Sequence, residues 1–480
     1  MGSKLLRKNS FFNVIYKFSN VLFPLIFTSY VSHVLLANGV GKVASAQNIV
    51  QYFTIIAALG IPNYGIREIA KTINNQNQQN IVFSELFIIN FFSTLLCSIA
   101  YYGLIFSVSY FQNDRLLFAV VGLNIILNFI NVDWFYQGKE EYGYITLRNV
   151  IVKTISLICI FIFVKNQNDY VVYGLISTLA IAGNYIFNIV HLKKFSICLR
   201  FHNLSIQRHL KPVLLLLCTA IAIELYTLVD TTMLTYLTNS EVVAYYSNSM
   251  KLVKLLITMI TAIGGVLLPR LSYHIKLNEL DKCNEIVNSV FKLMLFLFVP
   301  SGIGLMLTAD SIIPILFGQS FYPAVTTLRI SALLVYALGF SNLFGTQVLL
   351  SFGGEKKLML CTIVGALINI SLNSLLIPKY QQNGAAIASI ISEATVSILT
   401  YMFSKKYITL SISRKYIVNT ICAALAMCIC VISVKMIIHN SFVSLISSMS
   451  VGIVSYSFIT IIGKNEVANS VIGLVRKKIK

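Results

Sequence analysis

Two lysines stand three residues apart inside a long apolar run, at Lys251 and Lys254. Residues three apart in a helix share one face, so both ammonium groups point the same way. A third lysine, Lys153, lies at a comparable depth in another apolar run. A charge near the middle of a bilayer costs from about 3 to more than 10 kcal/mol, so a deep lysine is a functional candidate. The three lysines predict a wet site that accepts an anion.

Deep acidic residues are the second set of candidates. Glu224 and Glu393 lie about halfway along apolar runs, and Asp230 lies nearer one end of its run. They predict a site for a coupling ion, H⁺ or Na⁺, and no other cofactor. A plainer alternative remains, in which Glu224 pairs with Lys251 or Lys254 and only fixes the packing of helices.

Other polar residues allow a structural interpretation as well as a functional one. Asp133 and Arg148 lie near the ends of consecutive apolar runs, where a mutual salt bridge relieves both charges. Asn48 and Asn248 could hydrogen-bond the hydroxyl groups of a ligand, or could join helices to one another. The six histidines and nine cysteines show no ligand spacing, so we predict no metal site.

Fourteen apolar runs must position these residues. A helix needs roughly 20 mostly apolar residues to cross a bilayer core. Because the 480 residues are 57% hydrophobic and only 11% charged, the composition excludes a water-soluble fold of this size. We therefore predict an all-α polytopic membrane protein with about 14 transmembrane helices, at about 11–36, 43–62, 81–106, 116–138, 144–165, 169–190, 213–237, 242–268, 287–308, 324–350, 357–378, 383–403, 414–437 and 442–463.

The positive charge orients the chain. Its formal net charge is +20, but Lys and Arg are spread along the whole sequence rather than gathered on one face, so we expect membrane lipids and no nucleic acid as partners. They crowd into every second connection between the apolar runs. The positive-inside rule makes those connections cytoplasmic, with both termini inside.

The chain divides into two similar halves. The basic connection 191–212 separates six predicted helices from six, and Asn48 aligns with Asn248 at an offset of 200 residues. We predict an N-terminal six-helix lobe at 1–190, a cytoplasmic loop at 191–212, a C-terminal six-helix lobe at 213–404, and two extra helices with a basic tail at 405–480. Two parallel lobes of this kind surround a central cavity.

Several motifs carry a family resemblance. The most specific runs from Asp133 to Gly138 and continues from Tyr144 to Asn149, and it contains the only tryptophan. Further segments are 46–49 with 64–71, 244–247 with 267–270, 316–318, and 376–379 with 384–388. Over about residues 10–405, the chain resembles the bacterial polysaccharide repeat-unit flippases, the Wzx-type O-antigen transporters of the MOP superfamily.

The resemblance implies a function without an enzymatic step. Such a flippase moves an undecaprenyl-diphosphate-linked oligosaccharide from the cytoplasmic to the periplasmic leaflet of the bacterial inner membrane, by alternating access, for O-antigen, lipopolysaccharide or other surface polysaccharide. A polysaccharide polymerase and chain-length machinery are candidate partners. With this cargo we expect Lys153, Lys251 and Lys254 to contact the diphosphate, and Arg67 and Arg148 to contribute at the cytoplasmic mouth.

Three other functions stay open. A drug or metabolite exporter on the same fold would favour cationic cargo, and the deep lysines speak against it. A peptidoglycan-precursor flippase of the same superfamily has the same charge requirements. A membrane polymerase or ligase should place charged groups on large outer loops, whereas the longest outer connection predicted here is about residues 309–323.

Overall fold

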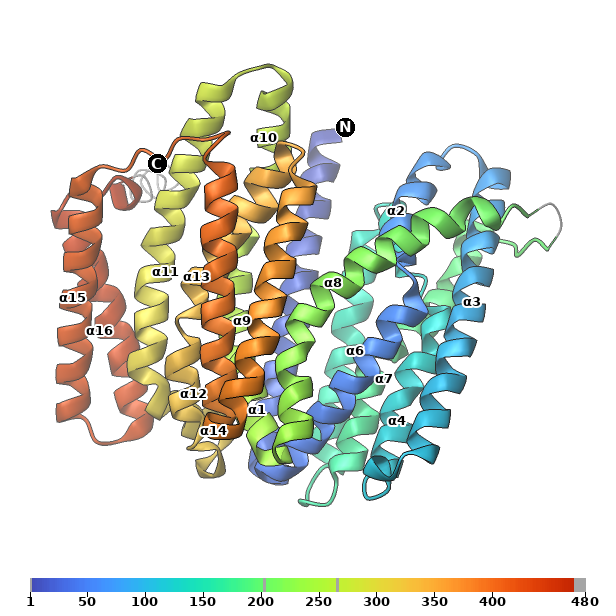
Figure 1. Ribbon diagram of the computed structural model, residues 1–480, viewed down its shortest axis with the longest axis horizontal. Coiled ribbons are helices and arrows are strands. Elements are labelled where there is room, and N and C mark those ends of the chain that lie inside the picture. Colours follow the sequence, from blue (N-terminus) through green and yellow to red (C-terminus); the bar gives the residue numbers. More distant parts are fainter. Residues whose placement is uncertain (1, 202–203, 265–266, 470–480) are drawn as a thin grey trace. The chain divides into compact units, whose positions relative to one another are not determined.

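The computed structural model describes residues 2–201, 204–264 and 267–469, and within them every regular element is helical (Figure 1). The chain forms two compact units, Met1–Ala244 and Tyr245–Lys480. The predicted lobe boundaries at 190 and 213 stay a prediction. The end of the predicted basic tail, residues 470–480, lies outside the described residues.

Unit 1 contains eight α-helices among its described residues, of which α1, α3, α4, α6, α7 and α8 are the long ones. Three short 3₁₀ turns, Ser109–Phe111, Leu127–Ile130 and Lys193–Phe195, lie between them. The helices are α1 (Gly2–Ala58), α2 (Ile61–Lys71), α3 (Gln76–Ser107), α4 (Arg115–Ile126), α5 (Asp133–Gly138), α6 (Tyr142–Phe163), α7 (Tyr170–Leu192) and α8 (Gln207–Leu237). Helix α8 bends along its length and packs on α1 and α2 (Figure 1).

A break divides α1 into two helices. Its 57 residues would be about 85 Å long if straight, far more than a bilayer core. Leu36 has φ 56° and ψ −174°, which is not helical. The two predicted helices at 11–36 and 43–62 are therefore the two parts of α1.

The fourth predicted helix, at 116–138, is interrupted. Helix α4 ends at Ile126, the 3₁₀ turn Leu127–Ile130 follows it directly, and α5 starts separately at Asp133. Asn90 Nδ2 donates to the carbonyl oxygens of Asn128 and Phe129 at 3.0 and 3.4 Å. The interruption is tolerated because a neighbouring side chain hydrogen-bonds carbonyl groups at the end of the 3₁₀ turn.

Unit 2 has the remaining helices. Helix α9 (Ser240–Gly264) starts in the last residues of unit 1 and continues into unit 2. The others are α10 (Leu267–Lys276), α11 (Leu280–Phe317), α12 (Ala324–Ser331), α13 (Leu334–Ser341), a π-helical stretch (Asn342–Leu349), α14 (Glu355–Ser404), α15 (Arg414–Ile437) and α16 (Ser441–Ile462), with a 3₁₀ turn at Gln319–Phe321. Helix α14 is broken at Gln381, with φ 49° and ψ −128°, so it also supplies two crossings.

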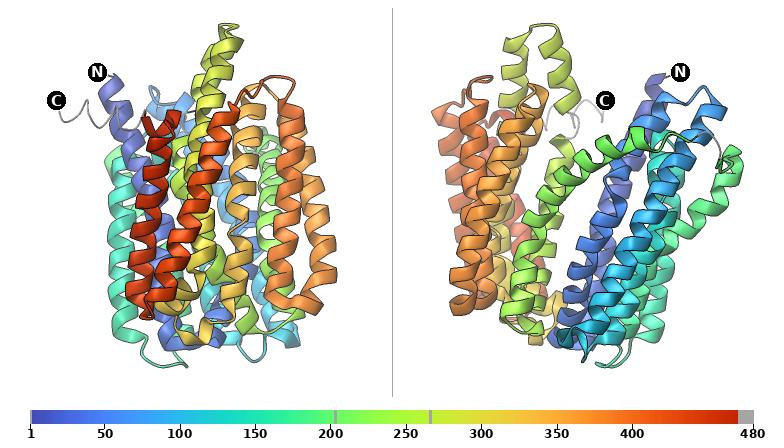
Figure 2. Two further views of the ribbon diagram at one scale, coloured as in Figure 1. Left: turned by 90° about the vertical axis from the view of Figure 1, so that its left-hand side faces the viewer. Right: turned by 45° about the vertical axis from the view of Figure 1, so that its right-hand side comes forward.

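The last two helices form a hairpin that packs on α11. Ala423, Met427, Val431 and Tyr456 form its buried apolar core. Lys435 Nζ lies 2.6 Å from both carboxylate oxygens of Asp310 on α11. Figure 2 shows the hairpin beside α11, while α10 and the start of α11 project beyond the ends of α14 and α15.

Two short amphipathic helices were not predicted from the sequence. Helix α2 buries Ile61, Tyr64, Gly65 and Ile69, and leaves Arg67 and Lys71 exposed. It packs on α5, where a Cβ atom on Gly65 would lie 2.5 Å from the ring of Trp134. Helix α10 follows α9 and likewise exposes Arg270 while burying Leu271. Such helices suit a membrane surface, where one face is wet and the other is packed.

The predicted all-α multi-pass fold is confirmed. Nine of the described helical runs are long and apolar enough to cross a membrane, and two of these include the breaks at Leu36 and Gln381. Each of the fourteen predicted spans overlaps helices among the described residues, although the span at 116–138 is interrupted. The connection predicted at 309–323 was wrong, because it is mostly helix: α11 continues to Phe317.

Candidate functional site

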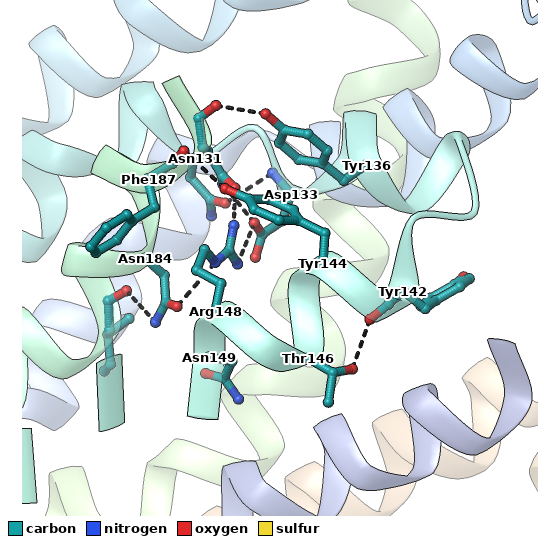
Figure 3. A network of polar contacts seen from close by, with 12 residues as sticks. Asn131, Asp133, Tyr136, Tyr142, Tyr144, Thr146, Arg148, Asn149, Asn184 and Phe187 are labelled. Carbon is teal, nitrogen blue, oxygen red and sulfur yellow. Dashed lines mark hydrogen bonds and ion pairs between the residues drawn. The ribbon is translucent and has the colours of Figure 1, made fainter. Parts of the chain in front are cut away.

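Arg148 on α6 lies at the centre of a buried polar network in unit 1 (Figure 3). Its Nη2 atom donates to Asp133 Oδ1 at 2.9 Å and its Nε atom to Asn184 Oδ1 at 3.1 Å, while Nη1 bonds Asn188. Asn188 in turn donates to Asp133 Oδ1 at 2.6 Å. The ion pair predicted between Asp133 and Arg148 is present, and these partners leave Arg148 little capacity for a ligand.

Lys153 lies on the same helix, about 16 Å from its first residue. The side chain is buried, with 6% of the residue exposed. Its Nζ atom donates to Asn20 Oδ1 and, at 3.4 Å, to the carbonyl oxygen of Ser19. In the described part of the chain no carboxylate lies within ion-pair distance of this ammonium group. Lys153 is therefore a buried cation held by neutral acceptors.

Asn149 links the lysine to α1. It lies one turn before Lys153, and its Nδ2 atom donates to Ser19 Oγ at 2.9 Å and to Asn20 Oδ1 at 3.1 Å. Figure 3 shows Arg148 and Asn149 pointing to different sides of α6, so one helix serves both groups of contacts. Asn20 itself is exposed.

The other predicted binding residues of unit 1 have different surroundings. Asn48 is buried and donates to Thr232 Oγ1 at 2.7 Å, which joins α1 to α8. Arg67 is exposed on α2, with its Nε atom 3.6 Å from Glu68 and its guanidinium group over the ring of Tyr64. Asn48 thus acts as a link between helices, while Arg67 lies open on the surface of its unit.

In unit 2, α9 brings two of the predicted residues together. Lys251 Nζ lies 3.4 Å from Asn248 Oδ1, and Asn248 is fully buried. Lys254, one turn further along, is exposed. The predicted pairing of either lysine with Glu224, which belongs to unit 1, stays a prediction.

The predicted ion-coupling acids also differ in their surroundings. Glu393 is buried on the second part of α14 and accepts from Ser341 Oγ at 2.8 Å, directly before the π-helical stretch. Glu224 accepts from Thr227 Oγ1 at 3.0 Å, and Asp230 is buried on α8. Among the described residues, no group of three or more His, Cys, Asp or Glu side chains could hold a metal ion.

A further buried acid was not predicted from the sequence. Glu85 on α3 is completely buried, and it accepts from Ser205 N at 2.6 Å, from Arg208 and from His209 at 2.7 Å. His209 also contacts the Tyr64 hydroxyl group at 2.8 Å. These bonds tie the start of α8 to α2 and α3. A glutamate ten residues into an apolar helix was the signal that could have revealed them.

Comparison with known proteins identifies the family of this chain. A model of the family described as "Polysaccharide biosynthesis protein" matches residues 6–274, more than half of the sequence. The chain belongs to this family. This polysaccharide biosynthesis protein is 24% identical to the protein named "Putative O-antigen transporter" of Escherichia coli (strain K12), over 83% of its own length and 96% of the relative. Its identity to the protein of that name from Shigella dysenteriae is also 24%, over 79% and 94% of the two chains.

Solved structures share its fold. The structure of "Lipid II flippase MurJ, inward closed conformation" superposes with a TM-score of 0.74 at 18% identity, covering 94% of this chain and 99% of that one. An inward-facing multidrug resistance MATE transporter of the MOP superfamily gives a TM-score of 0.65 at 13% identity, covering 80% and 93%. The resemblance inferred from the motifs is confirmed, and the polysaccharide biosynthesis protein is a multi-pass membrane transporter rather than an enzyme.

Proposed function

We propose that this protein flips an oligosaccharide repeat unit, linked to undecaprenyl diphosphate, from the cytoplasmic to the periplasmic leaflet. The product serves O-antigen or another surface polysaccharide. Membership of the polysaccharide biosynthesis family supports the assignment, as do the two relatives named as O-antigen transporters. The fold shared with a lipid II flippase agrees with a lipid-linked cargo.

The observation that carries the proposal is the state of Lys153. Burying a charge in a membrane protein is costly unless a partner compensates it. Here the nearest acceptors are an amide and a carbonyl oxygen, both neutral. A diphosphate supplies the missing negative charge when cargo is bound, so the cost of burying Lys153 is recovered as binding energy for an anionic headgroup.

Unit 2 contributes its own candidates. Lys251 with Asn248, and the exposed Lys254 on the same helix, offer donors to a second part of the headgroup. Arg67, exposed on the amphipathic helix α2, contributes at the cytoplasmic mouth. In this proposal the two lobes surround a central wet cavity that holds the glycan, and the polyprenyl tail remains in lipid during alternating access.

A coupling ion, H⁺ or Na⁺, completes the proposal. Glu393 is the first candidate because it is buried about halfway along a membrane helix and bonded to Ser341. Glu224 and Asp230 on α8 are the alternatives. Protonating or binding an ion at such a carboxylate changes the cost of keeping it in the membrane, which can bias one conformation over the other.

The orientation in the membrane follows from the charge distribution. Both termini are cytoplasmic, the membrane is the bacterial inner membrane, and a polysaccharide polymerase and its chain-length machinery receive the product. Single cysteines introduced at Lys4 and Lys165, in a variant whose nine native cysteines are replaced by serine, are labelled with a membrane-impermeant maleimide in intact cells to test this topology. Only the cysteine at 165 should react.

Surface glycan display in cells tests the function. In a strain whose own gene for this transporter is deleted, the wild-type protein should restore the glycan. Lys153→Gln should reduce display at least tenfold at equal protein abundance, while the exposed Lys165→Gln should behave as the wild type. Normal display with Lys153→Gln would refute the role of this lysine.

A further inference from the structure

Asn20 connects the buried lysine to the surface of unit 1. It is an exposed residue on the first part of α1. Its Oδ1 atom accepts from both Lys153 Nζ and Asn149 Nδ2, and both of these donors belong to buried residues of α6. The exposed asparagine therefore covers a buried cation.

Counting donors and acceptors shows what this cluster can still bind. An amide oxygen has two lone pairs, and those of Asn20 are both used. Ser19 Oγ donates to the carbonyl oxygen of Tyr16 and accepts from Asn149. Asn20 also shares a hydrogen bond with the Tyr16 hydroxyl group, whose oxygen accepts one N–H of the Asn20 amide. The donors with remaining capacity are the third N–H of Lys153, the second N–H of Asn20 and the O–H of Tyr16, and the remaining acceptor is Asn149 Oδ1. Three of these four groups can donate.

The net charge of the cluster is positive, which also favours a negatively charged ligand. Among the described residues, Asp133 is the carboxylate that acts on Tyr16, and it is already paired with Arg148 and bonded by Asn188. These two opposite charges cancel, which leaves the charge of Lys153. A group of donors with a net positive charge favours an oxyanion and disfavours a cation or a neutral acceptor-poor ligand.

We infer that Asn20 and Lys153 form a single oxyanion-binding site on unit 1, in which Asn20 orients the ammonium group through Oδ1 and contacts the ligand through its amide N–H₂. The inference rests on the proposed function and adds to it a specific ligand contact on α1. The oxyanion is either the diphosphate of the lipid carrier or the carboxylate of an acidic sugar in the repeat unit.

Asn20→Asp separates ligand binding from a purely structural role. The carboxylate still accepts from Lys153 and Asn149, and it adds an ion pair, so the folded protein should be as stable as the wild type or more stable. It has no N–H₂ group and it repels an anion. Loss of binding in a protein of undiminished thermal stability is therefore the expected result, and a structural role alone predicts no loss.

Binding is measured on the full-length protein in detergent micelles, by the rise in its unfolding temperature on adding farnesyl diphosphate. Farnesol is the neutral control for the lipid. The wild type should respond to the diphosphate, and the apparent affinity should fall at least tenfold in Asn20→Asp. Asn38→Asp, an exposed change just after the break in α1, should bind as the wild type does.

A parallel titration with glucuronic acid, against glucose, distinguishes the two sources of the oxyanion. A response to either anion that disappears in Asn20→Asp supports the site and assigns its source. A response unchanged in Asn20→Asp, or no response to either anion, overturns the inference. Glycan display in cells separates the inference from the proposed function. Normal display with Asn20→Asp but not with Lys153→Gln contradicts the Asn20 site alone, and normal display with both variants contradicts the role of Lys153 as well. Failure of the wild-type protein to restore display contradicts the proposed function itself.

Discussion

Arg148 and Lys153 lie five residues apart on α6, yet only Arg148 has a carboxylate partner among the described residues. Arg148 is bonded to Asp133, Asn184 and Asn188, whereas Lys153 has only neutral acceptors. The same helix thus holds a compensated charge, which contributes to structure, and an uncompensated one, which is available for a ligand. This difference gives the two residues opposite expected phenotypes.

Removing the carboxylate of Asp133 should destabilise the protein. Asp133→Asn leaves Arg148 buried without its counter-ion, at a cost of about 3 kcal/mol. The double variant Asp133→Asn, Arg148→Gln should lose much less than the sum of the two single variants, because it leaves no unpaired charge. Thermal unfolding in detergent measures all three. Additive losses would show that the pair is not energetically coupled.

Close packing of α2 on α5 gives a second prediction. Gly65→Ala places a Cβ atom 2.5 Å from the Trp134 ring, so it should cost about 1–3 kcal/mol of unfolding free energy. The control is Gly103→Ala on α3, where no atom beyond the neighbouring residues and the backbone of the same helix lies within 4 Å of the new Cβ. That change should be neutral or stabilising by up to about 1 kcal/mol. Equal effects at the two sites would contradict the packing described here.

The hairpin of α15 and α16 should pack less tightly on α11 when the ion pair between Lys435 and Asp310 is removed. Lys435 contacts Asp310, which Arg329 also approaches at 3.2 Å. With Asp310→Asn, the connection at 438–440 between α15 and α16, which directly follows Lys435, should be cut several times faster by a protease added to the purified protein. Glu355→Gln, at the start of α14, serves as the control because no described ion pair involves it. Unchanged cleavage would mean that apolar packing alone holds the hairpin.

The connection between α10 and α11 should depend on pH. Hydrogen bonds from Lys282 and His274 lower the pKa of Glu279 below its ordinary value of 4.5. A lowered pKa means that the contacts stabilise the connection above pH 4.5 and lose this effect as the pH falls through the lower, folded-state pKa. The protection factors for hydrogen exchange at residues 277–279, which are corrected for the intrinsic pH dependence of exchange, should fall as the pH falls through that acidic range in the wild type. They should stay constant in Glu279→Gln. A loss of protection centred above pH 4.5 would contradict the assignment.

Much of this arrangement could be inferred from the sequence, for physical reasons. Apolar length alone predicts membrane helices, because lipid leaves the backbone no other way to satisfy its hydrogen bonds. The depth of Lys153 within its run could be read in the same way. Asp133 and Arg148 could be paired because two charges near adjacent helix ends relieve each other.

Other features depend on tertiary contacts that no periodicity encodes. Asn20 looked like any polar residue in an apolar run, and its role depends on α1 lying beside Asn149 and Lys153 of α6. Helices α2 and α10 were missed because ten or eleven residues with several charges resemble a loop. The break after α4 was missed because it depends on Asn90, a residue about forty positions away.

The central claim is that Lys153 binds the anionic headgroup of a lipid-linked cargo. Its most direct test is the rate at which purified protein in proteoliposomes moves a fluorescent, polyprenyl-diphosphate-linked sugar out of reach of a quencher. We predict that Lys153→Gln lowers this rate at least tenfold while Lys165→Gln leaves it unchanged. Equal rates for the wild type and Lys153→Gln would contradict the account.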